Sequence, residues 1–259
     1  MSAFNEKFAR LCGGVAVAAL LGVAAPAQAD RIQLGFILDG SGSIGAGGWQ
    51  TIVTGLSNAI DLIPVGGPDQ YEVSVVTFST SASTPVARYL LTDVASRDTL
   101  SDMIAAIPFL TGNTNYAAAF DTMTNVLQST IGLADATYVN FATDGQPNTG
   151  GTGVLQRDAM IAAGVDNISI EGIGSGVSAA SLQNNFCYPG PCDTTIPFSD
   201  FPSKGFYIGV GNPDEYAQAI QYKVRVVTGQ VVPEPESIAL LGIGLIGLVP
   251  WLRRRTGKA

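Results

Sequence analysis

The stretch FILDGSGSIGAGGW carries three small oxygen-bearing side chains at alternate positions, directly after an apolar run. They are Asp39, Ser41 and Ser43. Alternate residues of an extended segment face the same way, and Gly40 and Gly42 between them let the backbone bend closely around a small ion. The stretch is therefore either a Gly/Ser-rich turn or one part of a metal site whose other ligands lie elsewhere in the chain.

Two later segments offer further oxygen ligands. LTGNTNYAAAF places Thr114 in a loop that leads into a helix, and ATYVNFATDGQPN is an apolar strand that ends at Asp144. Ligands bind beyond the carboxyl ends of the strands in a mostly parallel α/β sheet, so Asp39 and Asp144 are expected at one edge. Hydroxyls with few carboxylates suit Mg²⁺, or Mn²⁺ by chemical similarity. Because two acids leave such a cation under-neutralised, a carboxylate from outside could complete its ligand set.

Each of these residues also has a purely structural interpretation. Ser41 and Ser43 could cap the helix that follows them, and Asn113 or Thr114 could cap the next one. Asp144 could form an ordinary Asp-Gly turn. These roles would all have to coincide by chance, so the metal site is the stronger hypothesis.

The elements that must position these residues follow from an apolar pattern that alternates between strand-like runs and helical spacing. Strands are expected at 31–39, 71–79, 85–92, 136–144, 167–176 and 205–212, and helices at 49–63, 96–107, 116–130, 154–164, 178–186 and 213–227. Ser96 is expected to cap the second helix. The βαβα order predicts a doubly wound α/β fold with a mostly parallel central sheet and helices on both faces. The segment 85–92 is typical of a short antiparallel partner or edge strand.

Composition excludes several classes of function. The chain contains no histidine, which rules out a Ser-His-Asp triad, a Cys-His dyad and a histidine-ligated zinc. Residues 30–232 hold 18 acidic and 7 basic side chains, a net charge of −11. Such a charge argues against nucleic acid as a partner and against adhesion to anionic lipid. Contact with a membrane is therefore expected only through the terminal segments.

The amino-terminal segment 1–29 has the parts of a secretory signal peptide. Lys7 and Arg10 precede a short apolar run, and AQA before Asp30 is a small-residue cleavage site. We expect cleavage after Ala29, with a retained membrane anchor as the alternative.

The carboxyl-terminal segment 231–259 has the order Pro-Glu-Pro, short apolar run and arginine cluster. By physical chemistry alone it is a stop or anchor that follows export, with its arginines on the cytoplasmic side. The order also resembles the PEP-CTERM sorting signal of Gram-negative bacteria. That resemblance implies transient anchoring in the inner membrane, recognition by an exosortase, removal of the tail and delivery to the cell surface or extracellular matrix. A plain tail anchor is the alternative.

Export also bears on the cysteines. Removal of the signal peptide removes Cys12 and leaves Cys187 and Cys192 in CYPGPC. A disulfide is the default for such a pair in an exported protein. A redox or metal-binding role is the weaker alternative, because the spacing is not C-x-x-C.

The motifs together resemble the metal-ion-dependent adhesion site of von Willebrand factor type A domains. The resemblance runs from about Arg31 to Val227 of the expected domain at 30–230, and 85–92 matches the family's single antiparallel edge strand in a Rossmann-like fold. Carried over residue by residue, it assigns the metal ligands to Asp39, Ser41 and Ser43 in DGSGS, Thr114 in GNTN and Asp144 in ATDG. It implies a bound Mg²⁺ or Mn²⁺ that captures a carboxylate of a protein or polysaccharide partner.

The sequence favours an exported, surface-sorted adhesion protein that is not an enzyme. Two other functions stay open. One is a metal-dependent hydrolase that acts on an extracellular matrix polymer, and the other is a scaffold protein in which the metal is purely structural.

Overall fold

The computed structural model describes residues 29–230. The expected sorting segment, and the expected signal peptide apart from Ala29, lie outside the described residues. Within 29–230, no helix is both long enough and apolar enough to cross a membrane.

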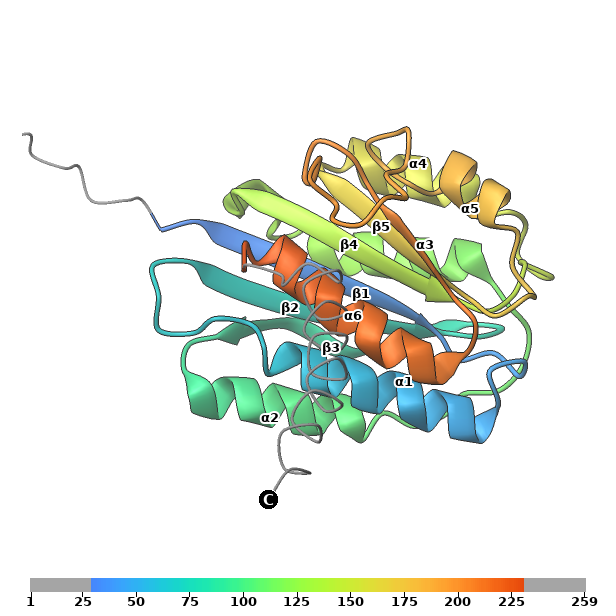
Figure 1. Cartoon of the computed structure of the whole chain (residues 1–259), viewed down its shortest axis with the longest axis horizontal. Helices are drawn as coiled ribbons and strands as arrows, with labels where there is room; N and C mark the ends of the chain where they lie inside the picture. Colours follow the sequence, from blue (N-terminus) through green and yellow to red (C-terminus); the bar gives the residue numbers. More distant parts are fainter. Residues whose placement is uncertain (1–28, 231–259) are drawn as a thin grey trace, which may run out of the picture.

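A single six-stranded sheet runs through the described chain, with strand order β3-β2-β1-β4-β5-β6 (Figure 1). The strands are β1 (Arg31–Asp39), β2 (Gln70–Phe78), β3 (Ala82–Leu91), β4 (Ala136–Thr143), β5 (Asn167–Ile173) and β6 (Tyr207–Val210). All neighbouring strands are parallel except β2 and β3. The fold is therefore the doubly wound α/β fold that the sequence predicts, with one antiparallel strand at an edge. That strand begins three residues earlier than expected, because Phe78 already pairs with Ala82 across a tight turn.

Helices cover both faces of the sheet. They are α1 (Gly45–Ile60), α2 (Val94–Ala105), α3 (Tyr116–Leu127), α4 (Val154–Ala162), α5 (Ala179–Asn185) and α6 (Pro213–Val227), with a short 3₁₀ turn at Ile131–Leu133. One apolar cluster joins α1, α2 and α6 to one face, and a second joins α3, α4 and α5 to the other. Alternate residues of β1 serve the two clusters, since Phe36 lies in the first and Ile37 in the second. Burial on both faces explains why most residues of the parallel strands are apolar.

The start of α2 corrects one expectation from the sequence. The cap is Asp93 rather than Ser96, because Oδ1 of Asp93 accepts a 2.7 Å hydrogen bond from the Ser96 backbone N–H. The Ser96 hydroxyl in turn accepts a 3.0 Å bond from the Asp93 backbone N–H. This reciprocal pair satisfies two amide groups at the helix start, and the helix therefore begins before Ser96.

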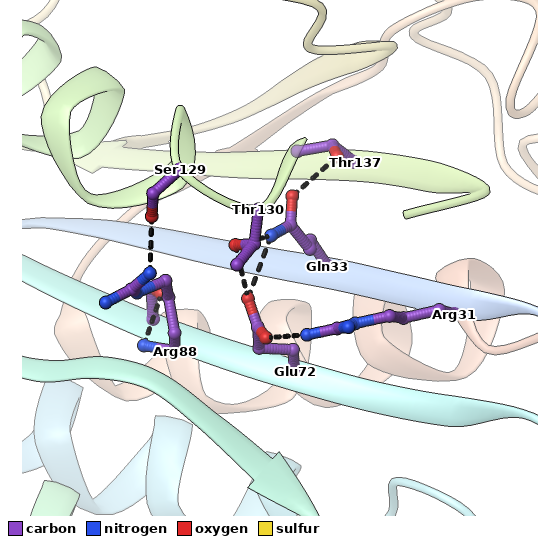
Figure 2. Close-up of polar contacts among 8 residues, drawn as sticks. Arg31, Gln33, Glu72, Arg88, Ser129, Thr130 and Thr137 are labelled. Atoms are coloured by element: carbon purple, nitrogen blue, oxygen red, sulfur yellow. Dashed lines mark hydrogen bonds and ion pairs between the residues drawn. The ribbon is translucent and has the colours of Figure 1, made fainter. Parts of the chain in front are cut away.

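A buried polar network holds the amino-terminal ends of the central strands together (Figure 2). Glu72 of β2 accepts hydrogen bonds from Gln33 at 2.8 Å and Thr130 at 2.9 Å, and it also pairs with Arg31. Gln33 accepts a 2.9 Å bond from Thr137 of β4. Burial alone would raise the pKa of Glu72, but these hydrogen bonds and the Arg31 charge hold it below its usual value. The network thus fixes the edge of the sheet where β1 and β4 begin.

Candidate metal centre

Two acidic residues lie at the carboxyl edge of the sheet, one at the end of each of two adjacent strands. Asp39 is the last residue of β1, and Asp144 directly follows β4. The two strands are parallel neighbours in which Leu38 pairs with Ala142, so both acids reach the same edge.

Two serines of the loop after β1 complete a chain of polar contacts at this edge. The Ser43 hydroxyl donates a 2.8 Å hydrogen bond to Oδ1 of Asp144. The hydroxyl oxygens of Ser41 and Ser43 lie 3.1 Å apart. The backbone N–H of Ser41 donates a 2.9 Å bond to Oδ1 of Asp39. The structure therefore brings together the four polar side chains that the sequence singles out on these two loops.

Asp39 is deeply buried, with 1% of its surface exposed. Desolvation raises its pKa to about 6, although hydrogen bonds from Ser41 and Thr143 oppose the rise and the nearby charge of Asp144 adds to it. The pKa of Asp144 is also raised, mainly by burial. Two neighbouring acids that are costly to ionise without a counter-charge form a site that a cation would stabilise.

Thr114 reaches the same place from the loop before α3. A Cβ atom built on Gly145 would lie 3.6 Å from the Thr114 hydroxyl and 3.7 Å from the Ser43 hydroxyl. Thr114 is 3% exposed, and its backbone N–H donates a 2.9 Å bond to the side chain of Asn148. All five candidate residues thus gather at one edge, where Thr114 makes no side-chain hydrogen bond to another described residue.

The helix-capping interpretation is wrong for the candidate hydroxyl residues. Helix α1 begins after Ile44, and no side chain caps it. The cap of α3 is Asn115, which accepts a 3.0 Å hydrogen bond from the Ala118 backbone N–H. The hydroxyls of Ser41, Ser43 and Thr114 are therefore not engaged at helix ends.

The glycines of the first loop act by close approach rather than by unusual dihedral angles. The backbone N–H of Gly42 bonds to the carbonyl oxygen of Gly112 at 2.9 Å, and that of Gly40 bonds to the carbonyl oxygen of Phe78 at 2.8 Å. A Cβ on Gly40 would lie 3.3 Å from the Trp49 ring. Glycine at these positions thus lets the loop after β1 pack closely against the end of β2 and against the loop before α3.

The site extends from the protein interior to its surface. Ser43 is exposed and Asp144 half-buried, whereas the other candidate ligands are buried. A depression of about 280 Å³ opens beside these two residues, and Ser175 and Asn212 also line it. A group from another molecule could therefore approach the cluster from this side.

Two supporting residues escaped the sequence analysis. Thr143 donates a 2.6 Å hydrogen bond to Oδ2 of Asp39, and Asn148 holds the loop that carries Thr114 through both its side chain and its backbone. Thr143 could have been found from the sequence, because it directly precedes Asp144 at the end of a buried strand. Across residues 29–230, no three His, Cys, Asp or Glu side chains gather as a metal site. The candidate is therefore built mainly from hydroxyls.

The cysteine loop lies between α5 and β6. Cys187 and Cys192 form a disulfide with a Cα–Cα distance of 5.6 Å. Tyr188 within the loop exchanges backbone hydrogen bonds of 2.7 and 3.0 Å with Ile168 of β5. The bond therefore closes a loop that is attached to the sheet.

Comparison with known proteins gives two family matches. Residues 33–196 match the von Willebrand factor type A domain, and residues 231–255 match the PEP-CTERM protein-sorting motif. The second match indicates that the protein is exported and sorted. The structure extends the domain beyond the first match, because β6 and α6 complete the sheet and one helical layer.

Two curated relatives cover different shares of the chain. Thrombospondin-related anonymous protein of Plasmodium berghei (strain Anka) is 27% identical over 225 residues, which is 82% of this chain and 33% of that protein. The collagen alpha-4(VI) chain of Mus musculus is 30% identical over 117 residues, which is 45% of this chain and 5% of that protein. The chain thus spans a third or less of the length of these relatives.

Solved structures share the fold. Proximal thread matrix protein 1 from the mussel byssus superposes with a TM-score of 0.56 and 20% identity, covering 77% of this chain and 46% of that one. One structure of the mussel protein has a zinc-occupied MIDAS motif. A von Willebrand factor type A protein from Catenulispora acidiphila gives a TM-score of 0.58 and 16% identity, covering 79% of this chain and 44% of that one. Since the first family match alone covers more than half of the 259 residues, this chain belongs to the von Willebrand factor type A domain family.

Proposed function

We propose that this protein is an exported adhesion module that binds its partner through a divalent cation. The ligands would be Asp39, Ser41, Ser43, Thr114 and Asp144, and the cation Mg²⁺ or Mn²⁺. The observation that carries the proposal is the chain of contacts from buried Asp39 through the two serines to Asp144, with the Thr114 hydroxyl beside it.

The donor set fits a hard divalent cation. Every candidate ligand offers oxygen, and hydroxyl and carboxylate oxygens are the ligands that Mg²⁺ and Mn²⁺ accept. The raised pKa of Asp39 is that of a carboxylate whose compensating charge must come from elsewhere. When bound, the cation would supply a positive centre for an acidic group of the partner. The partner would be a protein or a polysaccharide that offers a carboxylate.

The layout of the chain supports a role outside the cell. We propose that 1–29 is a signal peptide, 30–230 the adhesion domain and 231–259 the segment that an exosortase recognises and removes. The sorting-motif match supports the last of these. The protein would then reach the cell surface or the extracellular matrix of a Gram-negative bacterium.

Metal binding is tested first. The full chain is freed of metal with EDTA and titrated with Mg²⁺ and Mn²⁺ by calorimetry, alongside Asp39→Asn and Asp121→Asn. Asp121 is a matched control, since it is an exposed acid on α3. We expect the wild type and Asp121→Asn to bind one cation with equal affinity and Asp39→Asn to bind at least tenfold more weakly. Equal binding by all three chains would contradict the assigned site.

Partner binding is tested separately. The same three chains are used as bait for cell-surface extract in Mg²⁺ and in EDTA. A partner captured by the wild type and Asp121→Asn in Mg²⁺, and lost in EDTA and with Asp39→Asn, would support metal-dependent adhesion. A second outcome is that all three chains capture the same partners in Mg²⁺ and in EDTA, while Mg²⁺ raises the melting temperature of the wild type. That outcome would mean that the metal is structural. Hydrolysis of a matrix polymer that is lost in Asp39→Asn would instead indicate an enzyme.

A further inference from the structure

Helix α6 carries a buried lysine side chain on the face that packs against the sheet. Lys223 of α6 is 3% exposed and contacts Glu171 of β5 and Asn140 of β4, which are 0% and 4% exposed. Asn140 pairs with Ser169 across the parallel ladder, so Asn140, Ser169 and Glu171 share the sheet face that α6 covers. The helix therefore delivers a primary amine to a buried carboxamide and a buried carboxylate.

The amine lies within contact distance of both groups. Nζ of Lys223 is 3.0 Å from Oε1 of Glu171, donates a hydrogen bond to Oδ1 of Asn140, and lies 4.9 Å from the centre of the Phe206 ring. Lysine, carboxamide and carboxylate are thus packed against an aromatic ring, out of contact with bulk water.

The cluster is poorly satisfied as a simple ion pair. Within the described chain, the Nδ2 atom of Asn140, Oε2 of Glu171 and the hydroxyl of Tyr216 have no hydrogen-bond partner, and Oε1 of Glu171 lies in the ion pair with Lys223. Buried polar atoms are nearly always paired, and a buried ion pair stabilises a fold only when its remaining atoms are satisfied. A purely structural role explains this arrangement badly.

Burial also favours the uncharged forms of the pair. Desolvation lowers the pKa of Lys223 to about 8, although the charge of Glu171 opposes the change. Desolvation raises the pKa of Glu171 despite the nearby lysine. Transfer of one proton from lysine to glutamate would give a free amine and a carboxylic acid, and a desolvated amine is a competent nucleophile.

We propose that Lys223 and Asn140 form an intramolecular isopeptide bond, with Glu171 as the acid–base group. The lone pair of Nζ forms a bond to Cγ of Asn140 while the glutamic acid donates a hydrogen bond to Oδ1. The bond from Cγ to Nδ2 then breaks, and its electron pair leaves with the nitrogen. Glu171 carries one proton from Nζ to the departing group. The products are a secondary amide and ammonia, and no oxidant, reductant or other reactant is consumed.

The surroundings have room for the leaving group. A cavity of about 20 Å³ lies beside Asn140, Ser169 and Lys223, enough for one water-sized molecule such as ammonia. The new amide would remove the two opposite charges from the interior. It would also join α6 covalently to β4, two elements 83 residues apart in the chain at these positions.

The test is peptide mass spectrometry on the purified full chain, after reduction and trypsin digestion. If the bond forms, trypsin cannot cut after Lys223, and the peptide 205–225 appears attached to 98–157 through Asn140. The branched product is lighter than the two peptides together by one molecule of ammonia, and tandem fragmentation locates the junction. Cleavage after Lys204, an exposed lysine, is the internal control for complete digestion.

A wild-type digest in which 205–223 is released and 98–157 keeps its full mass would overturn the proposal. The Glu171→Gln variant, which keeps the side-chain volume, should release both unlinked peptides. A branched peptide as abundant in Glu171→Gln as in the wild type would overturn the role of Glu171. The wild-type result decides whether the bond exists even if the variant does not fold.

Discussion

The Ser43 hydroxyl donates a 2.8 Å hydrogen bond to the carboxylate of Asp144, although 101 residues separate the two in the chain. The bond joins the loop after β1 to the loop after β4. Because these strands are adjacent and parallel, loops that are far apart in the sequence meet at one edge of the sheet. The candidate site therefore exists only when the sheet is assembled.

Removal of the Thr114 hydroxyl should weaken cation binding. Thr114→Val keeps the shape of this buried residue, so its backbone bond to Asn148 should remain, whereas Thr114→Ser keeps the hydroxyl. Loss of one oxygen ligand is expected to cost about 1–3 kcal/mol of binding free energy, or roughly 5- to 150-fold in affinity. Titration of Mg²⁺ into both variants checks this. Equal affinity for the valine and serine variants would mean that Thr114 is not a ligand.

Cation affinity should fall as the pH drops through about 6, the pKa of Asp39 without metal. A carboxylate must lose its proton to bind a cation, and the pKa of Asp144 is raised as well. Calorimetric titrations at several pH values check the dependence. Affinity that stays constant across this range would contradict a role for Asp39 as a ligand.

The stability of the metal-free protein should show the opposite trend. The folded state holds the Asp39 proton up to about pH 6, whereas the unfolded chain releases it near pH 4. Stability is therefore lost as the pH rises through this window, by about 3 kcal/mol for a shift of this size. Denaturant melts in EDTA at pH 4 and pH 7 measure the total change, and Asp39→Asn should reduce the loss of stability between the two pH values by about this amount.

Helices α1 and α6 approach closely at one glycine. A Cβ on Gly55 of α1 would lie 2.8 Å from Cα of Ala217 on α6, so Gly55→Ala should destabilise the fold by about 1–3 kcal/mol. Gly47 of the same helix has nothing within 4 Å of the added Cβ. Gly47→Ala should therefore stabilise it by about 0.5–1 kcal/mol. Melting temperatures that move in the same direction for both variants would contradict this account of the interface.

The disulfide should contribute to stability without affecting the candidate metal centre. Replacement of Cys187 and Cys192 by alanine opens a short loop, for which the expected loss is about 2 kcal/mol of the free energy of unfolding. The Mg²⁺ affinity of the folded variant should equal that of the wild type. A joint loss of stability and affinity would show instead that the cysteine loop supports the site.

Much of the fold could be predicted because its signals are local. Buried parallel strands are near-continuous apolar runs, and the helix 213–227 was expected at the observed bounds of α6. Helix starts were harder, because several polar residues near each start can serve as the cap. Asp93 and Asn115 fill that role, whereas Ser96 and either Asn113 or Thr114 had been considered.

The five candidate ligands could be chosen from the sequence because each lies at the end of an expected strand or in a short polar segment that leads into an expected helix. Their supporting contacts could not be chosen in this way. Thr143 reaches Asp39 across 104 residues, and Lys223 reaches Asn140 across 83. Nothing in the local pattern around Lys223 distinguishes it from an exposed lysine on an amphipathic helix. Only the packing of α6 on the sheet places it in the interior.

The direction of α6 has a consequence for how the domain would be presented. The helix begins directly after its cap, Asn212, beside the depression next to Ser43 and Asp144, and runs the length of the sheet to its opposite end (Figure 1). There Gln230, the last described residue, donates a hydrogen bond to the carbonyl oxygen of Leu62. A helix of 15 residues spans about 22 Å. A tether joined to the chain after Gln230 would therefore hold the domain by one pole and leave the candidate site on the other, facing away from the surface that carries it.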